Sequence, residues 1–324
     1  MYLADLNTEL MKMNRIVCFF ILLTVVWSCK NDDDDGTISV PPQTLSETAI
    51  TNDAEIKTFL QTHFYNYEEF QNPPADFDFK IKFGLLADDA SKIPLIDQVQ
   101  TKLITELSST FGRTDDEEVQ HTLYYLSARD GVGESPTIGD NTVVRYEGSL
   151  LDGTLFDAST VPTSQYLSGF VRGYANGIVN FNAGVGPVDN GDGTVSFDDY
   201  GIGVIFMPSA LGYFDSPRAG SGIPFYAPLI FQVDVLAFEK NTDFDGDGIP
   251  SILEDLDGDG NLNNDNTDGD SEPTQVFLPN HNDTDDDNDG IDTIDEIELD
   301  ADGNFVGFLD TDGDGIFDHL DNDN

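Results

Sequence analysis

The stretch Val143 to Ser159, VVRYEGSLLDGTLFDAS, is the most informative part of this 324-residue chain. Its β-branched and aromatic residues flank Asp152-Gly153, a dipeptide that favours a tight turn between two antiparallel strands. Further strands are predicted over residues 121–126, 201–207 and 229–238. Residues 170–180 can form one short amphipathic helix. We therefore expect an α+β domain in which this helix covers one face of an antiparallel sheet.

Four blocks of this region, taken in order, resemble the FKBP-type peptidyl-prolyl cis–trans isomerases, or rotamases. The first is the quoted stretch, which is similar to the family's Val-x-Tyr-x-Gly, Leu-x-Asp-Gly and Phe-Asp-x-Ser motifs. The others are Phe170 to Gly177 (FVRGYANG), Met207 to Tyr213 (MPSALGY) and Gly222 to Leu236, which contains Ile223-Pro224. The resemblance implies an FKBP-like antiparallel sheet wrapped on a short helix, and isomerase activity toward X–Pro peptide bonds.

The family's functional positions correspond to eight residues of this sequence. The resemblance implies catalytic roles for Asp157, Tyr213, Phe156 and Tyr146, and substrate contacts for Val171, Tyr174, Ile223 and Phe231. Catalysis needs no cofactor, because a dry aromatic pocket favours a twisted amide, which has lost its resonance, over the planar hydrated amide. The alternative is that these aromatic residues, which alternate along strands, form an ordinary core.

The sequence departs from the family pattern at three places. Tyr174 stands where the pocket floor is usually Trp, which makes the proline contact smaller and more polar. Gly212 moves Tyr213 one residue further from Pro208. About fifteen residues are inserted between Gly184 and Tyr200. We expect a hairpin extension in this insertion, and a client-binding flap is the alternative.

The N-terminus has the pattern of a lipoprotein signal peptide, predicted over residues 1–28. Its apolar stretch, Ile16 to Val26, is too short to span a bilayer as a permanent helix. Val26-Trp27-Ser28-Cys29 resembles a lipobox. We expect Cys29 to be lipidated and to anchor the protein to the outer membrane, on the periplasmic side or exposed at the surface. An ordinary signal peptide with a chance cysteine is the alternative.

Residues 29–50 are predicted to be an acidic tether and linker. The run Asp32 to Asp35 either resembles a surface-export signal of some lipoproteins or serves only as a solvated tether. Residues 36–50 are rich in Pro, Ser and Thr and have no apolar period, as is typical of a linker.

Residues 51–118 are predicted to be a helical N-terminal extension that packs against the isomerase domain, which is predicted over residues 119–240. Apolar residues recur at helical spacing over 51–68 and again over 93–107. The candidate N-caps of the first helix are Thr51, Asn52 and Asp53.

The C-terminal segment, residues 241–324, is the most acidic part of a chain whose formal net charge is −48. It contains 28 acidic residues and neither Lys nor Arg. The net charge argues against nucleic acid as a partner, since phosphates would be repelled. The acidic residues recur as D-x-D-x-D-G with a carboxylate at position 12, a spacing that holds Ca²⁺ in one loop. Oxygen ligands without Cys favour Ca²⁺ over zinc.

Three such loops, which begin at Asp243, Asp285 and Asp310, match this pattern in full, and one that begins at Asp255 matches in part. The expected metal ligands are Asp243, Asp245, Asp247, Glu254, Asp285, Asp287, Asp289, Glu296, Asp310, Asp312, Asp314, Asp318 and Asp321. The segment resembles thrombospondin type 3 repeats, which implies a loop-rich structural module that is largely unfolded without calcium. A disordered acidic tail with fortuitous spacing is the alternative.

The sequence as a whole predicts a lipid-anchored isomerase that acts on proline-containing client proteins of the cell envelope as a folding helper. Gliding-motility lipoproteins are one setting in which similar domains occur. The alternative function is a noncatalytic FKBP-like binding module, whose calcium-stabilised repeats serve surface adhesion or assembly.

Overall fold

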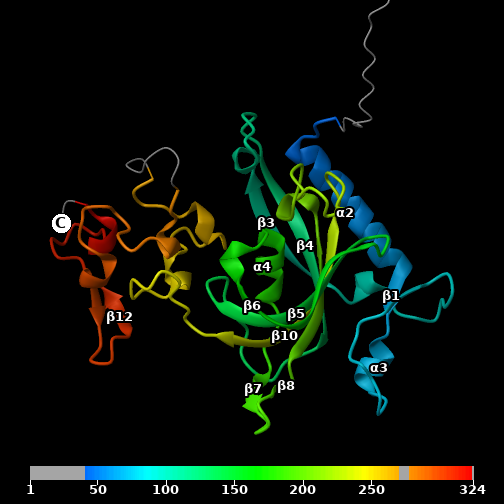
Figure 1. Ribbon diagram of the computed structural model, residues 1–324. Coiled ribbons are helices and arrows are strands. Elements are labelled where there is room, and N and C mark those ends of the chain that lie inside the picture. Colours follow the sequence, from blue (N-terminus) through cyan, green and yellow to red (C-terminus); the bar gives the residue numbers. More distant parts are fainter. Residues whose placement is uncertain (1–40, 270–276, 323–324) are drawn as a thin grey trace, which may run out of the picture. The chain divides into compact units, whose positions relative to one another are not determined.

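The computed structural model describes residues 41–269 and 277–322. Its main element is a six-stranded antiparallel sheet with the strand order β3-β4-β9-β10-β5-β6 (Figure 1). The strands are β3 (Gln100–Leu107), β4 (Glu118–Arg129), β5 (Asn141–Leu150), β6 (Leu155–Tyr166), β9 (Gly201–Met207) and β10 (Leu229–Glu239). The predicted antiparallel sheet is confirmed, and each strand expected from the sequence lies in it.

The two faces of this sheet pack against different helices. Ile205 of β9 belongs to a core beneath α4 (Arg172–Ile178), whereas its neighbours Val204 and Phe206 belong to a core beneath α2 (Leu45–Thr62). All seven residues of β9 are buried, which requires cover on both faces. Figure 1 shows α2 and α4 on opposite sides of the sheet. The short helix expected over residues 170–180 is therefore confirmed, and α2 covers the face that it leaves.

The first helix begins earlier than the sequence predicts. Thr44 is its N-cap, and it exchanges hydrogen bonds with Glu47 in a capping box. Leu45 is fully buried in a small core with Phe214. The linker prediction is therefore wrong for residues 45–50, because the capping box and the burial of Leu45 outweigh a composition typical of linkers.

The helix predicted over residues 93–107 is wrong. Leu95–Asp97 form a single 3-10 turn, and the residues after it form the edge strand β3. This strand pairs with β4 along its whole length. Ile104 is buried in the core beneath α4, whereas Leu103 is 61% exposed. Residues that match one helical face thus lie on opposite faces of a strand, since pairing with β4 outweighs the local pattern.

Two short hairpins accompany the sheet. The first pairs β1 (His63–Tyr65) with β2 (Phe83–Leu85), and α3 (Tyr67–Gln71) lies between them in sequence. The second pairs β7 (Val185–Asp189) with β8 (Val195–Asp198) and confirms the hairpin predicted for the insertion. This part of the chain also contains 3-10 turns at Ser108–Phe111, Leu167–Gly169 and Ser209–Leu211.

The C-terminal segment consists of loops and short turns. One small hairpin pairs β11 (Ile297–Leu299) with β12 (Phe305–Phe308). The 3-10 turns span Ser251–Glu254, Leu262–Asn264, Asn280–Asn282, Thr293–Asp295 and Asp318–Leu320. Over residues 41–269 and 277–322, no helix is both long and apolar enough to cross a membrane. The predicted signal peptide and Cys29 lie outside the described residues.

Asn52 is not an N-cap but a buried connection between α2 and the loops that precede β10. Its amide nitrogen donates to the carbonyl oxygen of Tyr226 at 3.0 Å, and its amide oxygen accepts from the backbone N–H of Ser209 at 2.8 Å. The side chain is almost completely buried.

Asn52→Ala is expected to lower the free energy of unfolding by roughly 2–4 kcal/mol, because it leaves two buried backbone groups without a partner. Urea unfolding followed by circular dichroism measures this loss. Thr51→Ala on the exposed side of the same helix is the control and is expected to change stability by less than about 0.5 kcal/mol. Equal losses in the two variants would show that the buried contacts of Asn52 do not hold the helix.

Candidate functional site

Four aromatic rings from three strands and one helix pack around one another. They are Tyr146 of β5, Phe156 of β6, Phe231 of β10 and Tyr174 of α4. The ring centres of Tyr174 and Phe231 lie 5.0 Å apart, those of Phe156 and Phe231 5.5 Å, and those of Tyr146 and Tyr174 6.1 Å. All three pairs are edge-to-face, a favoured geometry for aromatic rings. Tyr174 and Phe231 are buried, and Tyr146 and Phe156 are half-buried.

Gly148 leaves the space in which these rings meet. The pairing of β5 with β10 places Phe231 opposite Gly148, and the pairing with β6 places Asp157 opposite it on the other side. A Cβ atom at this glycine would lie 2.7 Å from the ring of Phe156 and 2.9 Å from the ring of Phe231. A larger residue would push the two rings aside, so the glycine in the first sequence block is a requirement of the cluster.

Two tyrosine hydroxyl groups have defined partners in the cluster. The Tyr146 hydroxyl donates to Oδ2 of Asp157 at 2.9 Å, and the Tyr174 hydroxyl donates to Oε1 of the buried Gln165 at 2.8 Å. Burial, and then the hydrogen bond to Asp157, raises the pKa of Tyr146 to about 12. Burial also raises the pKa of Tyr174. Both hydroxyls therefore keep their protons at neutral pH and act as donors.

Tyr213, Val171 and Ile223 pack against the same core as the four rings. Burial, and then the negative charge of Asp157, raises the pKa of Tyr213. The Tyr213 hydroxyl therefore keeps its proton at neutral pH. The structure thus brings all eight predicted residues to one region around α4 and the adjacent strands. Their roles in catalysis stay predictions.

Sequence reasoning missed two residues that hold this arrangement. Gln165 accepts the hydroxyl of Tyr174, and a Tyr in place of Trp signals the need for such an acceptor without identifying it. Arg172 anchors the first turn of α4, because one of its nitrogens contacts the buried Glu106 at 3.1 Å and the other contacts Asp259 at 3.0 Å. These partners are 66 and 87 residues away in sequence, so no local pattern points to them.

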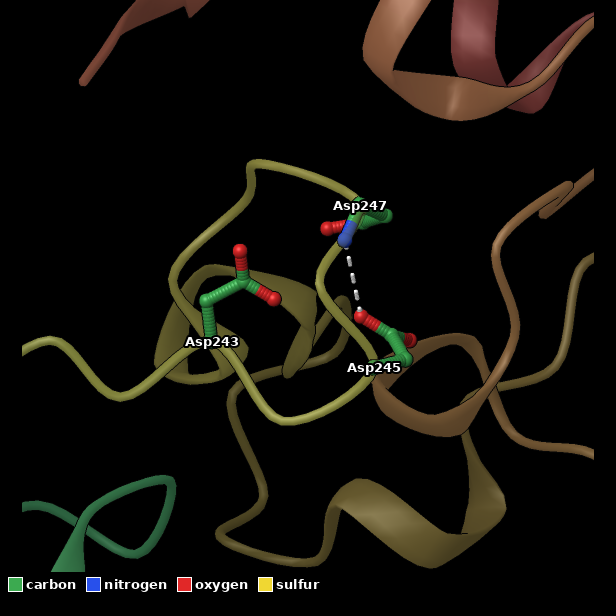
Figure 2. Close-up of side chains that lie close together, drawn as sticks. All are labelled: Asp243, Asp245 and Asp247. Carbon is green, nitrogen blue, oxygen red and sulfur yellow. Dashed lines mark hydrogen bonds between the residues drawn. The ribbon is translucent and has the colours of Figure 1, made fainter. Parts of the chain in front are cut away.

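The acidic loops of the C-terminal segment also place carboxylates as predicted. In the first loop, oxygens of Asp243, Asp245 and Asp247 all lie within 4.8 Å of one another (Figure 2). The same holds for three further groups of carboxylates, Asp255/Asp257/Asp259, Asp285/Asp287/Asp289 and Asp310/Asp312/Asp314. These groups are positions 1, 3 and 5 of the four loops.

The backbone of the loops repeats together with the carboxylates. The glycine at position 6 has a positive φ in every loop, at Gly248, Gly260, Gly290 and Gly315. In the first loop the N–H of Gly248 donates to Asp243 at 3.0 Å. The N–H of Gly260 donates to Asp255 at 3.1 Å in the second loop. Glycine is favoured there, because position 6 of such a loop makes a sharp turn in the left-handed region.

The predicted ligands after position 6 differ in their surroundings: these are Glu254, Glu296 and Asp321 at position 12, and Asp318 at position 9. Glu254 lies in a further group with Asp247 and Asp286, a residue that sequence reasoning missed because it occupies a variable position of its loop. Asp318 accepts hydrogen bonds from the backbone N–H and the hydroxyl of Thr311, at 2.7 and 2.5 Å. In the part of the chain that the structure describes, no such group of three includes Glu296, Asp318 or Asp321.

The first two loops lie directly against the sheet domain. Phe244 stacks on Tyr166 with ring centres 4.2 Å apart. The side-chain amide of Asn176 donates to the carbonyl oxygen of Gly260 at 3.0 Å, next to the contact between Arg172 and Asp259. The acidic segment is therefore attached to α4, the helix that carries Tyr174.

Comparison with known proteins gives relatives for about a third of the chain, and no family model matches it. The peptidyl-prolyl cis-trans isomerase Mip of Coxiella burnetii is 29% identical over 121 residues, which are 36% of this chain and 45% of that protein. The FKBP-type isomerase FkpA of Escherichia coli K12 is 32% identical over 118 residues, which are 35% of this chain and 37% of that protein. The chain thus spans less than half the length of these two bacterial relatives.

Solved structures similar to this chain include FkpA from Escherichia coli, which is 23% identical with a TM-score of 0.32. The alignment covers 60% of this chain and 62% of that one. The FK506-binding protein 1 of Dictyostelium discoideum is 31% identical over 113 residues, which are 34% of this chain but 92% of that protein. Since this match covers nearly the whole of a small FK506-binding protein, the chain belongs to the FKBP-type peptidyl-prolyl isomerase family.

Proposed function

We propose that the sheet domain catalyses the cis–trans isomerisation of X–Pro peptide bonds. The observation that carries this proposal is the meeting of Tyr146, Phe156, Tyr174 and Phe231 beside the carboxylate of Asp157. The relatives named as isomerases support the same activity. Nucleophiles and metals are not needed, since no covalent bond of the substrate is broken.

The chemistry is the selective stabilisation of a twisted amide. Resonance sets a barrier of about 18–20 kcal/mol to rotation, and twisting removes the resonance and makes the carbonyl less polar. Aromatic surroundings favour this less polar, less hydrated form. In this proposal the proline ring lies against Tyr174 and Phe231, and Phe156 and Tyr146 border the twisting bond.

Hydrogen bonds would orient the peptide on both sides of that bond. Val171 precedes the first turn of α4, where backbone N–H groups have no partner within the helix, so its N–H can bind a substrate carbonyl. The hydroxyl of Tyr213 keeps its proton and can donate to a second carbonyl. Asp157 fixes the hydroxyl of Tyr146 and lies exposed at the edge of the cluster.

A noncatalytic binding module is the second candidate. Tyr174, the residue at the floor of the pocket, favours this candidate. Its hydroxyl already donates its hydrogen bond to Gln165, and its ring is smaller than the usual Trp. Such a module would hold a proline-containing partner without lowering the rotational barrier, and the calcium-stabilised repeats would serve adhesion or assembly.

We further propose that the C-terminal loops are structural calcium sites of the thrombospondin type 3 kind. Four loops with the same carboxylate spacing and the same glycine conformation support this proposal. Calcium is the cation that favours six to eight oxygen ligands in such loops. The ions would supply the counter-charge that a segment without Lys or Arg lacks.

The cellular setting is also a proposal. A lipid on Cys29 would hold the protein at the outer membrane, and its clients would be proline-containing proteins of the cell envelope, as in lipoproteins associated with gliding motility. The lipobox-like sequence supports the anchor.

Phe156→Ala is expected to lower kcat/KM for a prolyl peptide about 10- to 100-fold, which corresponds to roughly 1.4–2.7 kcal/mol of lost transition-state binding. A protease-coupled isomerisation assay measures this rate. Leu155→Ala changes the neighbouring residue, which is 58% exposed, and is the matched control with nearly unchanged activity. If the unaltered protein binds prolyl peptides but shows no rate above background, the binding module replaces the enzyme.

Calcium is expected to raise the stability of the C-terminal segment, by about 2.7 kcal/mol for each site when the ion is at 100 times its dissociation constant. Circular dichroism and thermal unfolding, with calcium and with a chelator, measure this effect. Asp312→Asn should abolish one site, whereas Asp302→Asn, outside the carboxylate groups, should leave all sites intact. A flat calcium titration would contradict the calcium proposal.

Cys29→Ser is expected to abolish incorporation of labelled palmitate and to release the protein from the membrane fraction. Cys18→Ser, within the predicted signal peptide, is the control and should retain both properties. Membrane retention of Cys29→Ser would show that no lipid on this residue anchors the protein.

A further inference from the structure

Three buried carboxylates from two separate stretches of the C-terminal segment converge on one point. Oxygens of Asp247, Glu254 and Asp286 lie within 4.8 Å of one another. Their side chains are only 2%, 3% and 2% exposed. Asp247 and Glu254 belong to the first loop, whereas Asp286 comes from the third. The group shares Asp247 with position 5 of the first loop and adds Glu254 and Asp286 to it. It differs from the carboxylates at positions 1, 3 and 5 in that all three of its members are buried, whereas most of those are exposed or half-buried.

The charges of this group are not balanced by the protein. Both carboxylate oxygens of Glu254 and both of Asp286 lack a hydrogen-bond donor among the described residues. The same is true of Oδ2 of Asp247. No Lys or Arg occurs from residue 241 onward. Buried carboxylates are otherwise paired with a cation or bound to a metal, because an isolated buried charge is costly.

The surrounding backbone holds the three side chains in place. The hydroxyl of Thr293, a fully buried residue, accepts the N–H of Asp286 at 3.2 Å. On the other side, the hydroxyl of the fully buried Ser251 accepts the N–H of Phe244 at 3.1 Å. The carboxylates therefore project from two ordered turns and not from freely moving chain ends.

The oxygens suit calcium in number and type. Three carboxylates offer six oxygens, and calcium takes six to eight oxygen ligands in flexible geometry. Magnesium demands near-octahedral geometry and usually keeps several waters, so it is rarely held by protein carboxylates alone. The group contains no Cys or His, which would favour zinc or a transition metal.

We propose that Asp247, Glu254 and Asp286 together hold one calcium ion that joins the first loop to the third. The ion deepens the proposed role of the segment as a calcium module, on which this inference rests, and it makes Asp286 a ligand. Phe244 of the first loop stacks on Tyr166 of the sheet domain. The ion would therefore connect the third loop to the sheet domain through the first loop.

The test uses the full-length protein and the variants Glu254→Gln, Asp286→Asn and their combination. Asp292→Asn is the matched control, because this exposed residue lies in the same segment outside the carboxylate groups. Isothermal titration with calcium is expected to show the loss of the same single ion in each single variant and no further loss in the double variant. The control should bind as many ions as the unaltered protein.

Stability is expected to change in opposite directions with and without calcium. In chelator, Asp286→Asn should raise the melting temperature, because it removes one of three buried like charges. In saturating calcium it should lower the melting temperature relative to the unaltered protein. The increase in chelator also shows that the variant folds. A lower melting temperature in both conditions would mean that Asp286 acts only through packing and would overturn the proposal.

Hydrogen exchange supplies a second readout. Calcium should protect amides around residues 247–254, and Asp286→Asn should remove this protection although it lies in another loop. If the variant keeps both the protection and the full number of ions, the shared site does not exist, while the calcium role of the other loops stands. If the unaltered protein takes up no calcium at all, the proposed calcium module itself fails.

Discussion

Strand β9 is buried on both faces, and the placement of helices on both sides of the sheet follows from this burial. A strand that is apolar on both sides needs cover on each side of the sheet. The seven residues of α4 cover one side at very close range, since a Cβ at Gly177 would lie 2.4 Å from the side chain of Ile205. The longer α2 covers the other side, and the buried Asn52 fastens it to Ser209 and Tyr226.

The close approach of α4 to the sheet also builds the site. It brings Tyr174 against Phe231, while the missing side chain at Gly148 admits the rings from the neighbouring strands. Arg172 then fixes the first turn of α4 between Glu106 of β3 and Asp259 of the acidic segment. The residue next to it, Val171, supplies the N–H proposed to bind substrate, so the position of this N–H depends on both the sheet and the acidic segment.

The acidic segment solves a different physical problem. It has few buried apolar residues, Ile249, Leu262 and Ile297 among them, and its many carboxylates repel one another. Packing alone cannot offset that repulsion, whereas cations that bind several oxygens can offset it and order the loops together. Glu254 and Asp286 are the residues at which the proposed cation would matter most, because they are buried and their carboxylate oxygens accept no hydrogen bond from the described residues.

Local sequence patterns predicted the hairpin at Asp152-Gly153, the short helix, the aromatic positions and the spacing of the acidic loops. All of these follow from turn chemistry or from periodicity over a few residues. Residues 100–107 form a strand because they pair with β4, a long-range contact that local spacing does not reveal. Local patterns also did not reveal that Gln165 accepts the hydroxyl of Tyr174 or that Asp286 lies beside Glu254. Burial and charge balance depend on which distant segments meet, and no local pattern contains that information.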